Sequence, residues 1–350
     1  MHICFTLSSL SCGGAERVAA TLSNYFVSQG HKVTLVLVSI DHNNTFYKLD
    51  ENIDVIPLIK TKKDKKPLRR IKILKNKLLE INPDVVISFL PHICIYAYLA
   101  LRHTKIPFIC SERNDPNKYS SFRKVLLKKA FKSANGCVFQ TKDSKQFYKS
   151  VSNDKSIIIR NPVNLTVDPN KTKGEPKEKV FISVGRLTPQ KNFSFLISTF
   201  QKYYAKHADY KLIIYGEGPL RNELENQIAS LGLKDVVLLP GTNDSWHEVA
   251  INSTGFISTS NYEGMPNCLE EALCLGCPSI ATDCPIGGSK DLINLLNSGI
   301  LIKMNNEEEL LDAMNNIIDG KYDGKVVDYS PLIIENIAIE WLSFIKKIIN

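Results

Sequence analysis

An alternation of strand and helix patterns, repeated twice, constrains this chain more than any other feature of its sequence. In the first half, short and mostly apolar runs predict strands at residues 3–7, 32–40, 85–89, 108–110, 136–139 and 156–159. Between them, apolar residues recur every three or four positions at 15–28 and 122–131, which is typical of helices. Strands that alternate with helices favour a doubly wound parallel sheet.

The same alternation begins again after a polar segment at residues 166–179, which is predicted to be a linker. Strands are predicted at residues 180–184, 211–215, 236–239, 256–260 and 278–281, and helices at 193–204, 220–231 and 267–275. The predicted fold class is α/β, with two facing Rossmann-like domains at residues 1–165 and 180–330 and ligands in the cleft at the carboxyl ends of the strands. A last helical pattern at residues 331–350 is expected to pack back on the first domain.

Composition and charge narrow the class of protein further. With 350 residues, 43% of them hydrophobic and 23% charged, the chain has the composition of a two-domain globular protein rather than a disordered or fibrous one. Residues 1–165 hold 27 of the 44 basic and 12 of the 36 acidic residues, so the first domain is expected to face an anionic partner. No run approaches the ~18 apolar residues of a spanning helix, and the apolar start leads at once into a glycine turn, so a cytosolic protein is expected.

The nine cysteines are expected to be reduced thiols that pack as small apolar side chains, because their number is odd and several lie in apolar runs. Cys274 and Cys277 form a C-x-x-C pair, but no second pair accompanies it in the sequence. No metal site is therefore expected.

A glycine turn joins the first predicted strand to the first helix, in the sequence S-C-G-G-A-E at residues 11–16. Gly13 and Gly14 would let backbone N–H groups approach an anion at the helix N-terminus. A tight turn that binds nothing is the alternative. Because the turn is not G-x-G-x-x-G, a dinucleotide site is disfavoured.

The corresponding turn of the second half has the sequence G-R-L-T-P-Q-K-N at residues 185–192. Arg186 offers a planar fork of donors and Lys191 a compact charge, and together they suit a diphosphate at the carboxyl end of a strand. A solvated basic loop is the alternative, but the place of this turn in an otherwise acidic half favours a site.

Two glutamates frame the start of a later helix in Y-E-G-M-P-N-C-L-E-E-A, residues 262–272. Glu263 could accept from sugar hydroxyls, while Glu271, one turn inside the helix, could bind a ribose diol. The backbone of residues 264–267 would offer amides to the same ligand. Glutamates that face solvent on a helix are the usual explanation of such a pair. The pair supports a binding site only when it is considered together with the turn at residues 185–192. A second glycine turn at Gly287 and Gly288 suits an anion or simple chain reversal.

In this order and spacing, the segments resemble the family 4 retaining glycosyltransferases of the GT-B fold, especially bacterial members that build O-antigen, capsule and lipid-linked oligosaccharides. The resemblance covers nearly the whole chain and rests on the motifs GGAER, VFQT, RNPV, SVGRLTPQKN, IIYGEGPLRNEL, LPGTND, SNYEGMPNCLEEAL and IATDCPIGGSKDLI. It implies transfer of a hexose or N-acetylhexosamine from a nucleotide sugar, expected to be a UDP-sugar, to a surface glycan, expected to grow on polyprenyl diphosphate.

The resemblance also implies a role for each matching residue. Gly13 and Gly14 would contact the donor phosphates, and Arg186 and Lys191 would neutralise the diphosphate as it leaves. The remaining donor-binding residues would be Glu263 at the sugar hydroxyls, Glu271 at the ribose diol, Asn243 near the base, and Gly264, Met265, Pro266 and Asn267 through their backbone amides. Because no Asp-x-Asp occurs, the resemblance implies a metal-independent enzyme without a cofactor, with Glu263, Arg186 and Lys191 as its catalytic residues.

The front-side mechanism proposed for this class needs no nucleophilic side chain. The bond to phosphate loosens, the leaving diphosphate takes the proton of the acceptor hydroxyl, and configuration is retained. Many relatives carry a histidine after the fourth strand, where this chain has S-E-R-N-D-P at residues 111–116. Either His92 or Arg113 is therefore expected to face the sugar and the acceptor.

Two basic segments of the first half predict an anionic membrane surface as a partner. Residues 60–77 hold ten basic side chains and the single acid Asp64, and Ile71, Leu74, Leu78 and Ile81 fall on one helical face; a second basic helix spans residues 123–132. Anionic lipid attracts such segments with about 1 kcal/mol per Lys or Arg, so peripheral docking on the inner face of the cytoplasmic membrane is expected. The contact candidates are Lys62, Lys63, Lys65, Lys66, Arg69, Arg70 and Lys72.

Other readings of the sequence remain open. The basic face could be solvated and pack its apolar stripe on the sheet, whereas no nucleic-acid partner is expected because no module for one is recognisable. A sugar-nucleotide epimerase could use the same two domains. An NAD-dependent oxidoreductase would place Asp41 at a ribose, but the missing G-x-G-x-x-G and the residues Arg186 and Lys191 disfavour it.

Overall fold

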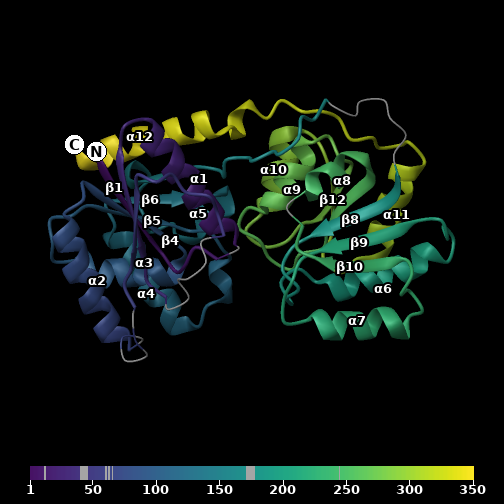
Figure 1. Cartoon of the computed structure of the whole chain (residues 1–350), viewed down its shortest axis with the longest axis horizontal. Coiled ribbons are helices and arrows are strands. Elements are labelled where there is room, and N and C mark those ends of the chain that lie inside the picture. Colours follow the sequence, from purple (N-terminus) through teal and green to yellow (C-terminus); the bar gives the residue numbers. More distant parts are fainter. Residues whose placement is uncertain are drawn as a thin grey trace. The chain divides into compact units, whose positions relative to one another are not determined.

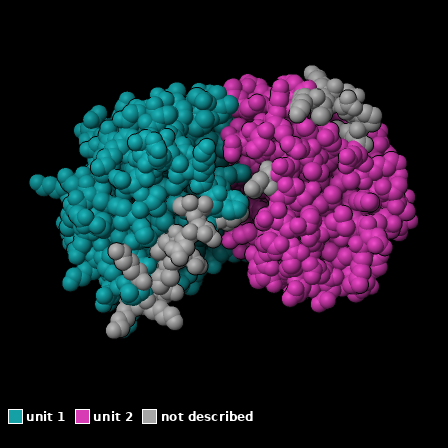
Figure 2. Space-filling view, in the orientation of Figure 1, with its two compact units in different colours: residues 1–162, 331–350 teal, residues 163–330 magenta. Residues whose placement is uncertain are grey.

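The chain forms two compact α/β units in a computed structural model that describes residues 1–11, 13–39, 46–59, 61, 64, 66–170, 178–243 and 245–350. The first unit comprises Met1–Pro162 together with Pro331–Asn350, and the second comprises Val163–Ser330 (Figures 1 and 2).

A parallel sheet forms the centre of the first unit. Its strands are β1 (His2–Leu7), β2 (Lys32–Leu37), β3 (Ile53–Pro57), β4 (Val85–Phe89), β5 (Phe108–Ser111), β6 (Gly136–Phe139) and β7 (Ser156–Ile158). They lie in the order β3-β2-β1-β4-β5-β6-β7. β1 and β4 are apolar along most of their length because both faces of the sheet are covered.

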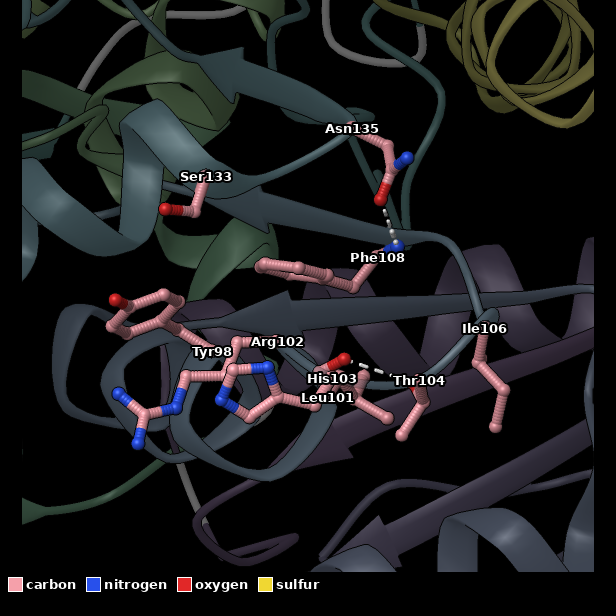
Figure 3. Close-up of a pocket in the computed structure, with 9 residues that line it drawn as sticks. All are labelled: Tyr98, Leu101, Arg102, His103, Thr104, Ile106, Phe108, Ser133 and Asn135. Atoms are coloured by element: carbon pink, nitrogen blue, oxygen red, sulfur yellow. Dashed lines mark hydrogen bonds between the residues drawn. The ribbon is translucent and has the colours of Figure 1, made fainter.

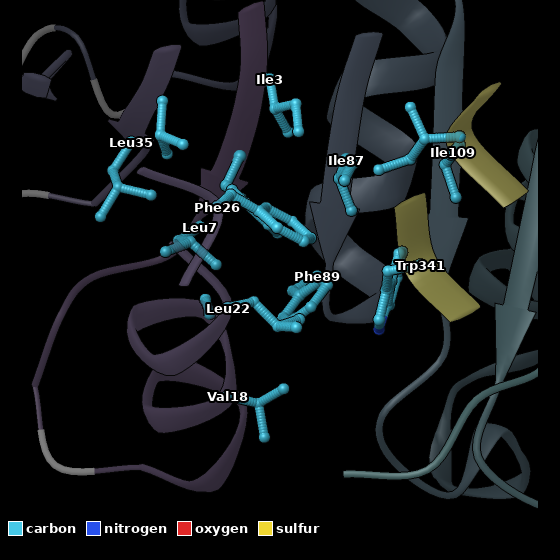
Figure 4. Packing of buried hydrophobic residues seen from close by; sticks show 14 of the residues in the cluster. Ile3, Leu7, Val18, Leu22, Phe26, Leu35, Ile87, Phe89, Ile109 and Trp341 are labelled. Atoms are coloured by element: carbon cyan, nitrogen blue, oxygen red, sulfur yellow. The ribbon is translucent and has the colours of Figure 1, made fainter. Parts of the chain in front are cut away.

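Helices cover both faces of this sheet. They are α1 (Gly14–Ser28), α2 (Pro67–Ile81), α3 (Pro91–Leu101), α4 (Ser121–Ser133), α5 (Lys142–Phe147) and α12 (Ile334–Ile349). On one face, Trp341 of α12 packs beside Phe89 of β4 in the cluster that also holds Phe26 of α1 (Figure 4). On the other face, α2, α3 and α4 contact one another in that order and bury Leu74, Ile93 and Leu127, among others. The last helix of the chain is therefore part of the core of the first unit.

The second unit repeats the design with a sheet of order β10-β9-β8-β11-β12-β13. Its strands are β8 (Glu178–Val184), β9 (Lys211–Tyr215), β10 (Val237–Gly241), β11 (Ser253–Ser258), β12 (Ser279–Thr282) and β13 (Ile300–Ile302). Its helices are α6 (Phe193–Tyr204), α7 (Arg221–Ser230), α8 (Trp246–Asn252), α9 (Asn267–Cys274), α10 (Gly288–Leu296) and α11 (Glu307–Ile318).

The doubly wound architecture predicted from the sequence is confirmed, and the bounds of some elements differ. The segment predicted as a linker, 166–179, extends too far, because β8 begins at Glu178. The backbone of Glu178 lies in register with Ser253 on β11, and Lys179 forms an ion pair with Asp209. The first two residues of β8, Glu178 and Lys179, are thus polar and exposed. The strand predicted at 32–40 ends at Leu37.

Candidate active site

The strand order of the second unit marks where a ligand can bind. The order of strands along the chain reverses between β8 and β11. In open α/β sheets, ligands bind at the carboxyl ends of the strands at such a reversal. The segment after β8 carries Arg186 and Lys191, and the segment after β11 carries Glu263, so the fold brings two of the predicted motifs to one edge.

Lys191 and Glu263 form an ion pair at this edge. Lys191 Nζ lies 2.6 Å from Glu263 Oε1, and Ser260 Oγ donates to the same oxygen at 2.9 Å. The two side chains are 17% and 9% exposed. Burial disfavours the charged ammonium, but the Glu263 carboxylate more than offsets this effect, so the pKa of Lys191 is raised. Lys191 is therefore a partly desolvated cation at neutral pH.

Backbone hydrogen bonds fix the turn that carries Lys191. Gly185 N–H donates to Tyr215 O at 2.9 Å. A Cβ on Gly216, whose φ is +147°, would lie 1.9 Å from Gly185 O, so only glycine fits where the two turns meet.

The same turn is also bound to the segment that carries Glu263. Asn261 N–H donates to Gln190 O at 2.8 Å, and the Gln190 side-chain amide donates to Tyr262 O at 3.0 Å. Lys191 and Glu263 are thus held by two segments that bind each other directly.

The other predicted donor-binding residues of this edge lie in the same two segments as Lys191 and Glu263. Arg186 is exposed, Gly264, Met265 and Pro266 are buried, and Asn267 begins α9. A Cβ on Gly288, the first residue of α10, would lie 1.9 Å from Gly264 O. Glycine at 288 therefore lets the N-terminus of α10 approach the turn before α9, and both helix ends offer a positive field to an anion.

Glu271 is enclosed by protein, which the sequence did not predict. Its side chain is 1% exposed, and Glu271 Oε2 lies 3.2 Å from Nε2 of His247, itself 3% exposed. His247 Nδ1 accepts from Thr166 N–H at 3.2 Å and lies 2.7 Å from Thr166 Oγ1. Sequence reasoning missed His247, and the only signal was its place four residues after Asn243.

Asn243 lies at the same edge of the sheet, just after β10. It is half-buried, and its Oδ1 accepts from Ser245 N–H at 2.8 Å. Asn243 thus lies just before α8, the helix that carries His247.

In the first unit, the strand order reverses between β1 and β4. The turn after β1 contains Gly13, and Gly14 begins α1. Gly13 N–H donates to Tyr47 Oη at 2.9 Å, and the Tyr47 hydroxyl donates to Gly13 O at 2.8 Å. A phosphate could bind this amide only after Tyr47 moves.

The two acceptor-side candidates lie in different surroundings. His92 is exposed, just after β4 in the first turn of α3. Desolvation by the neighbouring protein, followed by the positive charges of Arg123 and Arg70, lowers the pKa of His92. His92 is therefore a neutral, accessible imidazole near two guanidinium groups.

Arg113, in contrast, is 8% exposed and belongs to the packing of the first unit. Its guanidinium lies 4.1 Å from the centre of the Phe89 ring and 5.8 Å from that of Trp341. It donates to Ser111 Oγ at 3.0 Å and to Asn161 Oδ1 at 2.5 Å.

Glu112 is a buried acid that sequence reasoning did not select. Its Oε1 accepts from the backbone N–H groups of Arg113 and Asn114, each at 3.1 Å, and its Oε2 accepts from the Tyr148 hydroxyl at 2.5 Å. Burial outweighs these bonds and raises the pKa of Glu112 to about 8. These contacts fix the turn at residues 111–116.

The apolar stripe of the first basic helix packs in the core. Leu74 and Leu78 of α2 are buried, and Ile71 and Ile81 pack partly against the same cluster. Four other apolar side chains of α2 and α4 are exposed. They are Leu68 at the start of α2 (83%), Leu79 near its end (47%), and Phe122 and Val125 at the start of α4 (73% and 54%).

The basic candidates divide into two groups. Lys66, Arg69 and Lys72 are exposed, although Arg69 Nε also lies 2.7 Å from Asp64 Oδ1. Arg70 is half-buried, with its guanidinium 5.2 Å from the centre of the Tyr96 ring. Lys62, Lys63 and Lys65 lie outside the described residues.

The first unit also contains a pocket of about 440 Å³ (Figure 3). Tyr98, Arg102 and His103 line it near the end of α3, and Phe108 lines it at the start of β5. It thus lies at the amino ends of the strands, and no predicted site residue lines it.

Among the described residues, no three His, Cys, Asp or Glu side chains gather into a group that could hold a metal. The described cysteines are free thiols. No helix in the described part of the chain is long and apolar enough to cross a membrane.

Two family models match the chain, one for each unit. Residues 12–167 match the model described as Glycosyltransferase Family 4, and residues 166–329 match the one described as Glycosyl transferases group 1.

Similarity to other proteins extends over almost the full length of this chain. An uncharacterized glycosyltransferase of Haemophilus influenzae is 29% identical, with 96% of each chain covered. A Campylobacter jejuni protein is 27% identical over 100% of this chain and 99% of its own; its name is that of an alpha-1,4-N-acetyl-D-galactosaminyltransferase acting on a PP-undecaprenol-linked glycan. Among solved structures, Anabaena HepE in complex with UDP and glucose aligns with a TM-score of 0.79 at 16% identity, covering 98% of this chain and 99% of that one.

The two doubly wound sheets share the GT-B fold of these solved structures. The two family models identify the chain as a glycosyltransferase. The chain belongs to glycosyltransferase family 4, because the two family models together span residues 12–329.

Proposed function

We propose that this glycosyltransferase moves a hexose or N-acetylhexosamine from a UDP-sugar to a glycan linked to polyprenyl diphosphate, with retained configuration and without a metal. The Lys191–Glu263 ion pair, where the strand order reverses between β8 and β11, is the observation that supports a donor site. The acceptor half is supported by the name of the Campylobacter relative, and the choice of UDP by the Anabaena complex.

In this proposal, Lys191 and Arg186 stabilise the negative charge that grows on the leaving diphosphate. An incoming diphosphate gives Lys191 a second anion, so the Glu263 oxygen 2.6 Å away can accept instead from a hydroxyl of the donor sugar. The bond between the anomeric carbon and the phosphate oxygen breaks, and the acceptor oxygen bonds to the same face of that carbon. The released phosphate oxygen takes the acceptor proton. Preorganised cations stabilise this charge without the reorganisation that water would need.

We assign the acceptor side to His92 rather than Arg113. His92 is exposed and lies near Arg70 and Arg123, whereas the Arg113 guanidinium is enclosed by Phe89 and Trp341. The cations around His92 suit the phosphates of a lipid-linked acceptor.

Membrane docking, in the same proposal, uses the first turns of α2 and α4. Leu68, Phe122 and Val125 expose apolar surface, and Arg69 and Arg123 beside them are exposed cations. We call these five residues the docking face. Cations next to apolar side chains suit an anionic bilayer on the cytoplasmic side. The cations attract the lipid head groups, and the apolar side chains enter the interface.

Replacing both Leu68 and Phe122 by serine is expected to lower the partition of the protein onto vesicles of phosphatidylglycerol and phosphatidylethanolamine by about 10-fold, because apolar burial stabilises at about 25 cal/mol per Å². Co-sedimentation at low salt measures the bound fraction. Ile339→Ser is the matched control, since Ile339 is also exposed (59%) but lies on α12. Wild-type protein that stays in the supernatant with these vesicles would contradict the docking proposal.

Nucleotide binding is the first test of the donor site. UDP at about 100 times its Kd is expected to raise the free energy of unfolding by about 2.7 kcal/mol, and Glu271→Gln is expected to reduce this gain. Thermal melting with UDP, GDP and NAD in parallel measures it. A shift with NAD alone would contradict the proposed function, and sugar conversion without an acceptor would favour the epimerase.

A further inference from the structure

His247 links the proposed ribose carboxylate to the first residues of the second unit. On one side its Nε2 lies 3.2 Å from Glu271 Oε2, and on the other its Nδ1 lies 3.2 Å from Thr166 N and 2.7 Å from Thr166 Oγ1. The side chains of Glu271 and His247 are buried, 1% and 3% exposed. The contact spans α8, α9 and the segment that begins the second unit.

The partners of His247 fix its tautomer. A backbone N–H can only donate, so Nδ1, which faces Thr166 N–H, must be the acceptor nitrogen. In the neutral imidazole the proton then resides on Nε2 and points at Glu271 Oε2. The hydrogen bond to Glu271 is therefore directed by a contact on the far side of the ring.

This arrangement suits orientation of a carboxylate. A buried carboxylate is costly unless hydrogen bonds satisfy it, and a donor fixed from both sides holds one carboxylate oxygen in place. With Oε2 fixed, the position of Oε1 is determined by the geometry of the group. In metal sites, partners that orient a ligand in this manner contribute a 10- to 100-fold effect on affinity.

We propose that His247 is a positioning residue for the nucleotide ribose: it holds Glu271 in the orientation that binds the ribose diol, and Thr166 holds His247. This inference rests on the proposed function, because it takes a ribonucleotide as the ligand of Glu271. His247 touches no substrate in this proposal.

The test compares ribose with deoxyribose ligands. Wild-type protein is expected to bind UDP about 10- to 100-fold more tightly than 2′-deoxy-UDP, because a hydrogen bond to a charged group contributes about 1.5–3 kcal/mol. Titration calorimetry measures both Kd values, with GDP and 2′-deoxy-GDP in parallel. His247→Leu is expected to reduce this preference about 10-fold, mainly by raising the Kd for UDP.

His247→Gln separates positioning from packing. A Gln amide N–H can replace Nε2–H, so this variant is expected to recover most of the ribose preference. Thr166→Val, which keeps the backbone N–H and removes only the hydroxyl, is expected to give a smaller reduction and remains informative if His247→Leu does not fold. His207→Leu is the control, because His207 stacks on Tyr203 elsewhere in the same unit, with ring centroids 4.4 Å apart.

Each outcome has a separate meaning. A lower melting temperature with an unchanged preference in His247→Leu, His247→Gln and Thr166→Val would overturn the inference and leave His247 a packing residue. If Glu271→Gln loses the preference but the His247 variants keep it, only the inference fails. If wild-type protein binds neither UDP nor GDP, the proposed function fails and the inference with it.

Discussion

Lys191→Ala is expected to lower kcat for sugar transfer by about 100- to 1,000-fold, the usual cost of removing one group that stabilises transition-state charge. Lys191 is a partly desolvated cation whose charge is held by Glu263 at 2.6 Å. A charge fixed in a site of low dielectric acts more strongly on a leaving diphosphate than the same charge in water. Release of the nucleoside diphosphate from the donor, followed with and without acceptor, measures kcat.

The control must separate catalysis from stability. Lys191→Ala leaves the Glu263 carboxylate buried without its partner, which costs about 3–5 kcal/mol in typical buried pairs. The double variant Lys191→Ala with Glu263→Gln removes that unpaired charge, and it is expected to regain stability but not activity. Lys202→Ala breaks an exposed pair with Glu307 in the same unit and is expected to change stability by less than about 1 kcal/mol and to leave kcat unaltered. Full activity in the double variant would contradict the role of Lys191.

The sequence predicts those parts of the fold in which a local pattern carries the information. The helix of residues 193–204 and the strand of residues 211–215 match α6 and β9 residue for residue. The first has a clear helical period, and the second is a short apolar run that ends at a glycine. Helix α3 has no helical period because it is apolar on nearly every side, and it was not predicted. Helix α11 carries a visible start signal in Asn306, whose side chain accepts from Glu309 N–H, and it was overlooked.

The candidate site divides in a similar manner. Arg186, Lys191 and Glu263 belong to turns that follow strands, and the placement of those strands in a parallel sheet brings the turns together. The pairing of His247 with Glu271 depends on how α8 packs against α9, and no local pattern connects positions 24 residues apart. Two other hydrogen bonds depend on the tertiary fold in the same manner. The Tyr47 hydroxyl bonds the backbone of Gly13, and the Tyr148 hydroxyl bonds the Glu112 carboxylate.

Trp341→Ala is expected to lower the free energy of unfolding of the first unit by about 3–5 kcal/mol, as large aromatic truncations in cores do. Trp341 is fully buried, lies 5.9 Å from the Phe89 ring and belongs to the cluster formed by α1, α12 and the sheet (Figure 4). Its loss also opens one side of the Arg113 guanidinium. Urea unfolding followed by circular dichroism measures the change.

The chain has two tryptophans, one in each unit, and this makes the effect separable. In Trp341→Ala, the remaining fluorescence comes from Trp246 of α8, which reports on the second unit. The helical signal is expected to fall at lower urea than in the wild type, while the Trp246 transition stays near its wild-type midpoint. Ile339→Ala on the same helix removes an exposed side chain and is expected to change stability by less than about 0.5 kcal/mol. If Trp341→Ala were no more destabilising than Ile339→Ala, the C-terminal helix would not be part of the core of the first unit. The turn at residues 111–116 would then have to hold its shape without α12, because Arg113, packed against Trp341, joins that helix to this turn.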